Sequence, residues 1–247
     1  MKIRAAYDPH KRGLFYHLRA GLRFFFTGYR VLFRHPSLLA LSLVPIGLTL
    51  IALVLIASSV VWMAGSLMGP GLNPFSADLR MLAQALVLLI ALFVSYILYL
   101  PLARVLLAPF SEAISRRTRT VLGLKPERQT YGWARAMVEG IKMVLLQICL
   151  ALFGLSLGLV FPPIAAPVGL TIAICFVSLD YLDIPLSVKG LRLRQKLGVI
   201  GRNKALATGF GAAGYLTLII PVLNLLSLPV GVIGATILVD SLDRDAT

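Results

Sequence analysis

Four arginines near the start of the chain have the spacing of an anion-binding stripe. Arg19, Arg23, Arg30 and Arg34 are 4, 7 and 4 residues apart, which at 100° per residue keeps them within about 60° of one another on a helix. Such a stripe predicts one of two roles. Either it belongs to an interfacial amphipathic helix whose arginines reach lipid phosphates, or it forms a vestibule that attracts anions.

The residue types that support catalysis or metal binding do not form a recognisable pattern. All three histidines lie in the N-terminal segment, and no Asp or Glu stands in the middle of an apolar run. The sequence has no Gly-rich phosphate loop, no His-Glu-x-x-His motif and no Ser/His/Asp set that could converge. The cysteines, Cys149 and Cys175, read as small core residues. We therefore predict no enzyme, no cofactor and no metal, and the missing carboxylates disfavour proton coupling.

A passive anion pathway fits the polar groups that the apolar segments do contain. Amides, hydroxyls and proline-freed backbone N–H groups can replace the hydration of an anion, and helix N-termini add a favourable dipole. Arg104 lies near the inner membrane boundary, where it could reach lipid phosphates, pair with a carboxylate such as Glu112, or bind an anion. The predicted anion-pathway residues are Arg30, Arg34, Ser37, Arg104 and Asn224.

The composition places these residues in a membrane protein. Hydrophobic residues make up 58% of the chain and charged residues 14%, and the mean hydropathy is +0.88, which excludes an ordinary soluble domain. We predict an all-α polytopic membrane protein that forms one membrane domain over residues 1–247. The elements expected within it are an amphipathic helix 13–35, transmembrane helices 37–68 and 79–107, a cytoplasmic helical excursion 111–142, hairpins 143–179 and 205–239, and an interfacial helix 185–204.

The two hairpins are inferred from apolar segments that run about 35 residues without a charge and could exceed a single bilayer crossing. Their centres contain prolines, at Phe161-Pro162-Pro163 with Pro167 and at Ile220-Pro221 with Pro229. Proline removes an amide donor and blocks helix continuation, which favours a chain that turns back. Each hairpin either crosses the bilayer fully or penetrates it part way.

The net charge of +14 is distributed as membrane topology would require. Segments 1–36, 104–142 and 180–204 are rich in Lys and Arg, whereas 65–80 contains one basic residue. By the positive-inside rule the three basic segments lie in the cytoplasm and 65–80 lies outside. We therefore predict a multi-pass protein with both termini in the cytoplasm and with anionic lipids, rather than nucleic acid, as the partner of its basic surface.

The last apolar segment resembles the CysZ-type sulfate permease family, whose wider group includes the etoposide-induced 2.4 proteins. It contains Gly209-Phe210-Gly211, Ile220-Pro221-Val222-Leu223-Asn224, Pro229-Val230 and Gly234-Ala235-Thr236. Ala108-Pro109-Phe110 resembles the Ala-Pro-Phe of the family, and Asp183-Ile184-Pro185 resembles its Asp-Tyr-Pro, with Ile184 in place of tyrosine. The motif residues to which we assign a structural role are Pro109, Phe110, Asp183, Pro185, Gly211, Pro221, Asn224, Pro229, Gly234, Ala235 and Thr236.

This resemblance implies an oligomeric protein of the bacterial inner membrane, with two long transmembrane helices and two partly penetrating hairpins, that supplies sulfate for cysteine synthesis. The chain departs from the family where Pro-Gly-Leu/Ile-Arg-Arg would begin the first long helix, because it reads Pro36-Ser37-Leu38-Leu39. Arg30 and Arg34, one or two turns earlier, are the arginines that could substitute. The predicted function is a permease or channel-like pathway for sulfate or a similar small oxyanion. The alternative is a non-transporting factor that acts in assembly or lipid organisation through its basic amphipathic helices.

Overall fold

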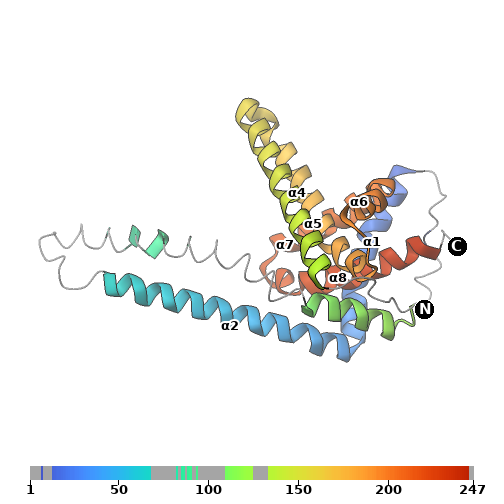
Figure 1. The fold of residues 1–247 in the computed structure, drawn as a ribbon, viewed down its shortest axis with the longest axis horizontal. Coiled ribbons are helices and arrows are strands. Elements are labelled where there is room, and N and C mark those ends of the chain that lie inside the picture. Colours follow the sequence, from blue (N-terminus) through green and yellow to red (C-terminus); the bar gives the residue numbers. More distant parts are fainter. Residues whose placement is uncertain are drawn as a thin grey trace, which may run out of the picture. The chain divides into compact units, whose positions relative to one another are not determined.

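The computed structural model describes residues 7, 13–67, 82, 85–86, 88–90, 93, 109–124 and 133–244, and within these ranges the regular structure is helical throughout. The prediction of an all-α protein is therefore confirmed. Most of the predicted helix 79–107, including Arg104, lies outside the described residues. The helices are α1 (Leu14–Arg34), α2 (Pro36–Leu67), α4 (Trp133–Val160), α5 (Pro162–Val188), α6 (Leu193–Arg202), α7 (Lys204–Ile219) and α8 (Pro221–Arg244), and residues 109–121 are also helical (Figure 1).

The chain divides into two compact units. The first contains Met1–Ala40 and Ser111–Thr247, and the second contains Leu41–Phe110. The second unit holds most of α2, a helix of 32 residues without a charged side chain. At 1.5 Å per residue α2 is about 48 Å long, which exceeds the hydrocarbon thickness of a bilayer. All further description of packing concerns the first unit.

Single residues separate the helices of each hairpin. Phe161 (φ −130°, ψ 77°) lies between α4 and α5, and Ile220 (φ −93°, ψ 111°) lies between α7 and α8. A proline follows each break as the first residue of the next helix, where its missing N–H costs no hydrogen bond. Two further prolines, Pro167 and Pro229, lie inside α5 and α8. The sequence therefore located the two turns, but not every proline in the predicted break contributes to one.

The helix boundaries at the base of the first hairpin also differ from the predicted ranges. Helix α4 begins at Trp133 and α5 continues to Val188, so the hairpin is longer than residues 143–179. Helix α6 is correspondingly shorter than the expected 185–204, since a turn at Gly190 precedes it. The φ of Gly190 is 75°, a left-handed conformation that glycine adopts without a Cβ penalty.

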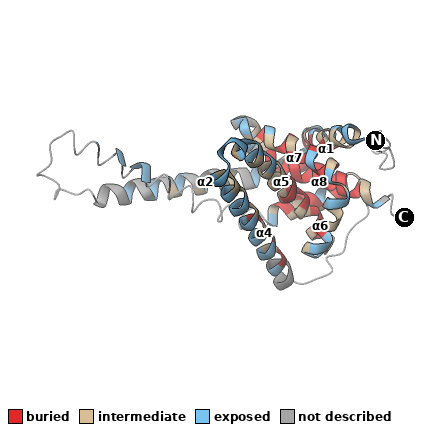
Figure 2. Cartoon of the chain, turned by 90° about the horizontal axis from the view of Figure 1, so that it is seen from above, coloured by how far each residue is buried: buried red, intermediate tan, exposed pale blue. Residues whose placement is uncertain are grey.

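The core of the unit forms where α1, α5, α7 and α8 pack together. Phe25, Leu32, Phe210 and Ile233 are completely buried there. The ring centroids of Phe25 and Phe210 are 5.3 Å apart in an edge-to-face arrangement, which is a favoured geometry for aromatic pairs. Figure 2 shows the buried residues concentrated on α1, α5, α7 and α8, whereas most of α4 is exposed.

Glycines bring the backbone of α1 against α7 and α8. A Cβ atom on Gly21 would overlap the carbonyl oxygen of Leu206 in α7, and one on Gly209 would overlap the carbonyl oxygen of Leu18 in α1. Gly28 makes the corresponding approach to α8. Small residues at crossing points allow this close contact of membrane helices, in which van der Waals packing supplies much of the stabilisation. The rotation of α1 about its axis is fixed by these contacts.

Three described stretches are long and apolar enough to cross a membrane, namely Val138–Val160, Pro162–Val188 and Leu226–Asp243. Within an 18-residue apolar part of each stretch, 11% of the residues are buried in the first and 17% in the second, compared with 72% in the third. The two hairpins therefore have different surroundings. The α4–α5 hairpin exposes an apolar surface that suits lipid, whereas α8 is enclosed by the other helices of its unit.

Candidate functional site

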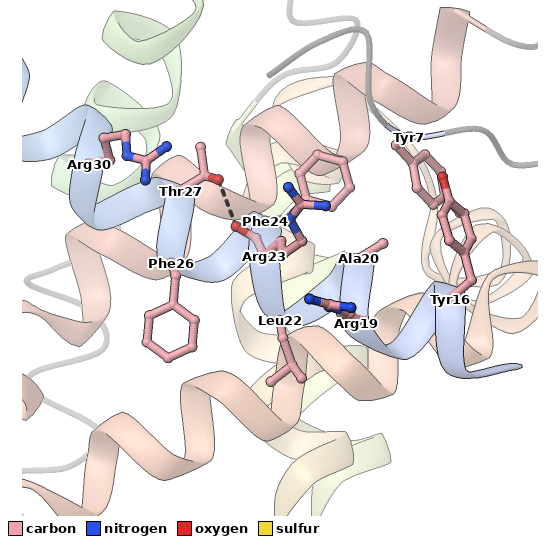
Figure 3. A pocket seen from close by; sticks show the side chains of 10 residues that line it. All are labelled: Tyr7, Tyr16, Arg19, Ala20, Leu22, Arg23, Phe24, Phe26, Thr27 and Arg30. Carbon is pink, nitrogen blue, oxygen red and sulfur yellow. Dashed lines mark hydrogen bonds between the residues drawn. The ribbon is translucent and has the colours of Figure 1, made fainter. Parts of the chain in front are cut away.

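A cavity of about 390 Å³ lies along α1 and is the candidate functional site (Figure 3). Three guanidinium groups line it, those of Arg19, Arg23 and Arg30. A water molecule occupies about 30 Å³ in the liquid, so the cavity has room for a small ion with part of its hydration shell. The remaining lining residues are Tyr7, Tyr16, Ala20, Leu22, Phe24, Phe26 and Thr27.

The electrostatic character of this cavity follows from the arginines, since none of the described residues that line it is acidic. The side chains of Arg19, Arg23 and Arg30 are all exposed, which keeps their charges hydrated. A guanidinium is always protonated and presents five N–H donors in a planar fork that matches oxyanions. A concave surface lined by charge of one sign raises the local concentration of the counter-ion. The cavity can thus attract and bind a small anion.

Aromatic residues form one end of the cavity. The rings of Tyr7 and Tyr16 are stacked, with centroids 6.0 Å apart and an interplanar angle of 5°. Tyr7 also meets the edge of Phe24 at 5.6 Å, and its hydroxyl lies 3.0 Å from Nδ1 of His17 in a hydrogen bond. These contacts bring Tyr7, six residues before the first residue of the described segment 13–67, onto the surface of α1.

The hydroxyl group of Thr27 is engaged within the helix. Its Oγ1 donates a hydrogen bond of 2.6 Å to the carbonyl oxygen of Arg23, as Figure 3 shows with a dashed line. Because that proton is committed to the backbone, Thr27 offers lone pairs rather than a donor to the cavity. Among the described lining residues, the charged donors available to an anion are the guanidinium groups of Arg19, Arg23 and Arg30.

Of the predicted anion-pathway residues, Arg30 lines the cavity together with two arginines of the same stripe, Arg19 and Arg23. The sequence signal for these two was the helical spacing of the stripe. Arg34, Ser37 and Asn224 are not among the residues that line it. Arg34 is exposed, Ser37 is half-buried in the first turn of α2, Asn224 is exposed near the start of α8, and Arg104 is outside the described residues.

The start of α2 is organised by leucines rather than by arginines. The N–H groups of Leu38 and Leu39 donate to the carbonyl oxygen of His35, at 2.9 and 3.2 Å, and the Leu38 side chain is completely buried. These two donors are satisfied within the turn. Leu38 stands where the family pattern has Leu or Ile, and the two positions at which the resemblance leads one to expect arginines are Leu39, which is half-buried, and Ala40, which is exposed.

Several motif residues contribute to helix packing. Gly211 approaches the backbone of α5 at Ile174, and Gly234 lies against Phe24 of α1. Ala235 and Thr236 are completely buried, and the Thr236 hydroxyl is 2.9 Å from that of Ser115. The places of the other motif residues are as follows: Pro109 and Phe110 are in the helical segment 109–121, Pro185 is inside α5 and buried, Pro221 begins α8, and Pro229 is buried in α8.

Asp183 belongs to a polar cluster that joins α5 to α6. The Lys196 ammonium donates to Oδ1 of Asp183 and to Oγ of Ser187, both at 2.6 Å, and the Lys196 side chain is only 3% exposed. The Ser187 hydroxyl donates in turn to the other Asp183 oxygen at 3.3 Å. A buried ammonium is stable only when it is paired and hydrogen-bonded. Asp183 therefore compensates the charge that holds α6 in place.

Further polar contacts connect α4 to its neighbours at the same end of the hairpin. The buried Glu139 accepts hydrogen bonds from the Lys142 ammonium and from the backbone N–H of Leu193, each at 2.8 Å. Leu193 is the first residue of α6, so the Glu139 carboxylate satisfies a donor at that helix N-terminus. The Gln147 amide donates to Asp180 at 2.5 Å. The charged residues of the hairpin thus lie toward its base, away from Phe161.

Comparison with known proteins agrees with the motif resemblance. A family model described as Sulfate transporter CysZ/Etoposide-induced protein 2.4 matches residues 24–229. A sulfate transporter CysZ of Pseudomonas aeruginosa is 26% identical over 232 residues, covering 88% of this chain and 93% of that protein. A protein of the same name from Pseudomonas syringae pv. tomato is 32% identical over 162 residues, or 62% of each chain. Because the family model spans most of its length, this chain belongs to the Sulfate transporter CysZ/Etoposide-induced protein 2.4 family of membrane proteins.

Proposed function

We propose that this multi-pass membrane protein provides a passive pathway for sulfate or a similar small oxyanion, and that the arginine cavity of α1 is where the anion is first bound. The relatives named sulfate transporter CysZ support the substrate class. The observation that carries the role of the cavity is its lining by Arg19, Arg23 and Arg30, with no acidic side chain among the lining residues that the structure describes. A divalent oxyanion could interact with more than one of these guanidinium groups.

The proposed setting is the bacterial inner membrane, with both chain termini in the cytoplasm and the protein assembled as an oligomer. The basic segments 1–36, 104–142 and 180–204 support this orientation through the positive-inside rule. The cavity would then face the cytoplasmic side. Arg34, Ser37, Arg104 and Asn224 remain candidate pathway residues beyond it.

Uptake of radiolabelled sulfate into vesicles that contain the purified protein tests this function directly. We expect uptake above that of empty vesicles, and we expect exchange of Arg19, Arg23 and Arg30 for glutamine to reduce the initial rate about tenfold or more at low salt. The reason is that a focused positive field raises the encounter rate of an anion, an effect of roughly 10-fold to 1,000-fold.

The matched control removes the same charge from another surface of the unit. Arg194, Arg202 and Lys204 are exposed and do not line the cavity, so their exchange for glutamine is expected to leave the rate within about twofold of wild type. No uptake by folded wild-type protein would contradict sulfate transport itself. Equal rates in the two triple variants would contradict only the role of the cavity.

A further inference from the structure

Helix α1 has a second apolar surface besides the one buried in the core. Phe15, Phe26 and Phe33 are 84%, 51% and 61% exposed. Their spacing of 11 and 7 residues places them within about 20° of one another on the helix. We call these three residues the phenylalanine strip. It extends over about 27 Å of helix, at 1.5 Å per residue, and exposed aromatic side chains in such an arrangement commonly mark an interaction surface.

The strip cannot turn inward, because the opposite side of α1 is already engaged. Gly21 and Gly28 face the backbones of α7 and α8, and Phe25 is completely buried between them. A rotation of α1 that buried the strip would remove these glycines from positions that no larger residue could occupy. The strip is therefore a permanent feature of the outer surface of the unit.

Arginines accompany the strip along its whole length. Arg19, Arg23, Arg30 and Arg34 occupy the adjacent sector of the helix, and all four are exposed. Charges at this frequency exclude a helix that crosses the hydrocarbon region, where each arginine would be costly. An apolar strip beside a row of arginines is instead the pattern of a helix that lies in the membrane interface.

Charge distinguishes between lipid and a second copy of the chain as the partner of this surface. The sequence of α1 contains no Asp or Glu. Two copies that paired through their strips across a twofold axis would bring eight arginines together without an acidic residue from either helix, which is unfavourable. The phosphate groups of an anionic membrane supply the missing negative charge.

We propose that the outer face of α1 docks on a surface of anionic phospholipid, with the phenylalanine strip at the boundary between headgroups and acyl chains and the arginines at the level of the phosphates. This arrangement places the arginine cavity at the edge of the membrane, because Phe26 lines the cavity and also belongs to the strip. The proposal concerns the position of α1 and does not depend on the transport of sulfate.

The test places a fluorescent label on the strip in vesicles of defined composition. Cys149 and Cys175 are replaced by alanine, and Phe26→Cys is labelled with an environment-sensitive dye and reconstituted in phosphatidylcholine containing phosphatidylglycerol. We expect blue-shifted emission that is quenched by acyl-chain nitroxide lipids and resists aqueous iodide. Phe33→Cys provides an independent second position. Thr120→Cys, at an exposed site outside α1, is the control and should show the opposite quenching pattern.

Each other outcome overturns the proposal. Quenching of the label at position 26 by iodide would place the strip in water. Protection from both quenchers would mean that protein covers it, including a second copy. Equal lipid quenching in vesicles of pure phosphatidylcholine would remove the requirement for anionic headgroups, since the arginines would then contribute nothing to docking.

Discussion

Replacing Gly209 by leucine is expected to destabilise the protein by about 3 kcal/mol, the upper part of the usual range for overpacking. For a chain of this size that corresponds to a fall of roughly 10 °C in Tm. Any Cβ at this position would overlap the carbonyl oxygen of Leu18 in α1. Backbone cannot move aside as the end of a flexible side chain can, so α1 and α7 must separate. Thermal unfolding of the purified protein in detergent measures the effect.

Gly198 supplies the control for this prediction. It lies inside α6, and a Cβ on it would meet no atom within 4 Å. Exchange of Gly198 for alanine should therefore leave Tm unchanged or raise it slightly, because alanine favours the helix by up to about 1 kcal/mol. A Gly209→Leu variant as stable as wild type would show that α1 does not pack closely on α7.

Replacing Lys196 by methionine is expected to destabilise the protein by about 3 kcal/mol, near the lower limit for breaking a buried ion pair. The substitution removes the ammonium that contacts Asp183 and Ser187. It leaves the Asp183 carboxylate, whose side chain is 23% exposed, without its cation. Helix α6 should then detach from α5, which a loss of Tm and faster proteolysis between α5 and α6 would report.

A second substitution separates lost charge compensation from lost packing. Combining Lys196→Met with Asp183→Asn removes both charges, so the double variant should recover a large part of the lost stability. The exposed partner of Lys189 provides a contrast. Asp243 is 55% exposed, and its exchange for asparagine should cost less than about 1 kcal/mol. If Lys196→Met and Asp243→Asn had equal effects, the cluster would not stabilise the fold.

The sequence was informative wherever the determining pattern is local. The positions of Phe161 and Ile220 between helices follow from the prolines after them. The arginine stripe follows from residue spacing along one helix, and three of its four members, Arg19, Arg23 and Arg30, line the cavity. The helix boundaries within residues 185–204 do not follow from a local pattern. The end of α5 and the start of α6 depend on the left-handed turn at Gly190 and on Glu139 from a distant helix.

The two hairpins show what local patterns leave undecided. Their apolar segments, 143–179 and 205–239, are both charge-free, proline-broken and of similar length, yet α4 is largely exposed whereas α8 is buried. The difference arises from the small residues of the second hairpin. Gly211 and Gly234 admit the backbones of α5 and α1, and their effect depends on helices that are far away in the sequence. Hydropathy alone cannot distinguish burial in protein from exposure to lipid, because both environments are apolar.

The sequence by itself determined that this is an all-α membrane protein, where its hairpins turn, which end of each apolar segment is basic, and to which family it belongs. These properties depend on composition, on periodicity along one helix and on short motifs. The tertiary structure alone decided which side of α1 is buried, that Tyr7 and Tyr16 join three arginines around one cavity, and that Lys196 is paired with Asp183. Each of these depends on surfaces from separate segments meeting in space, where shape and charge must match simultaneously.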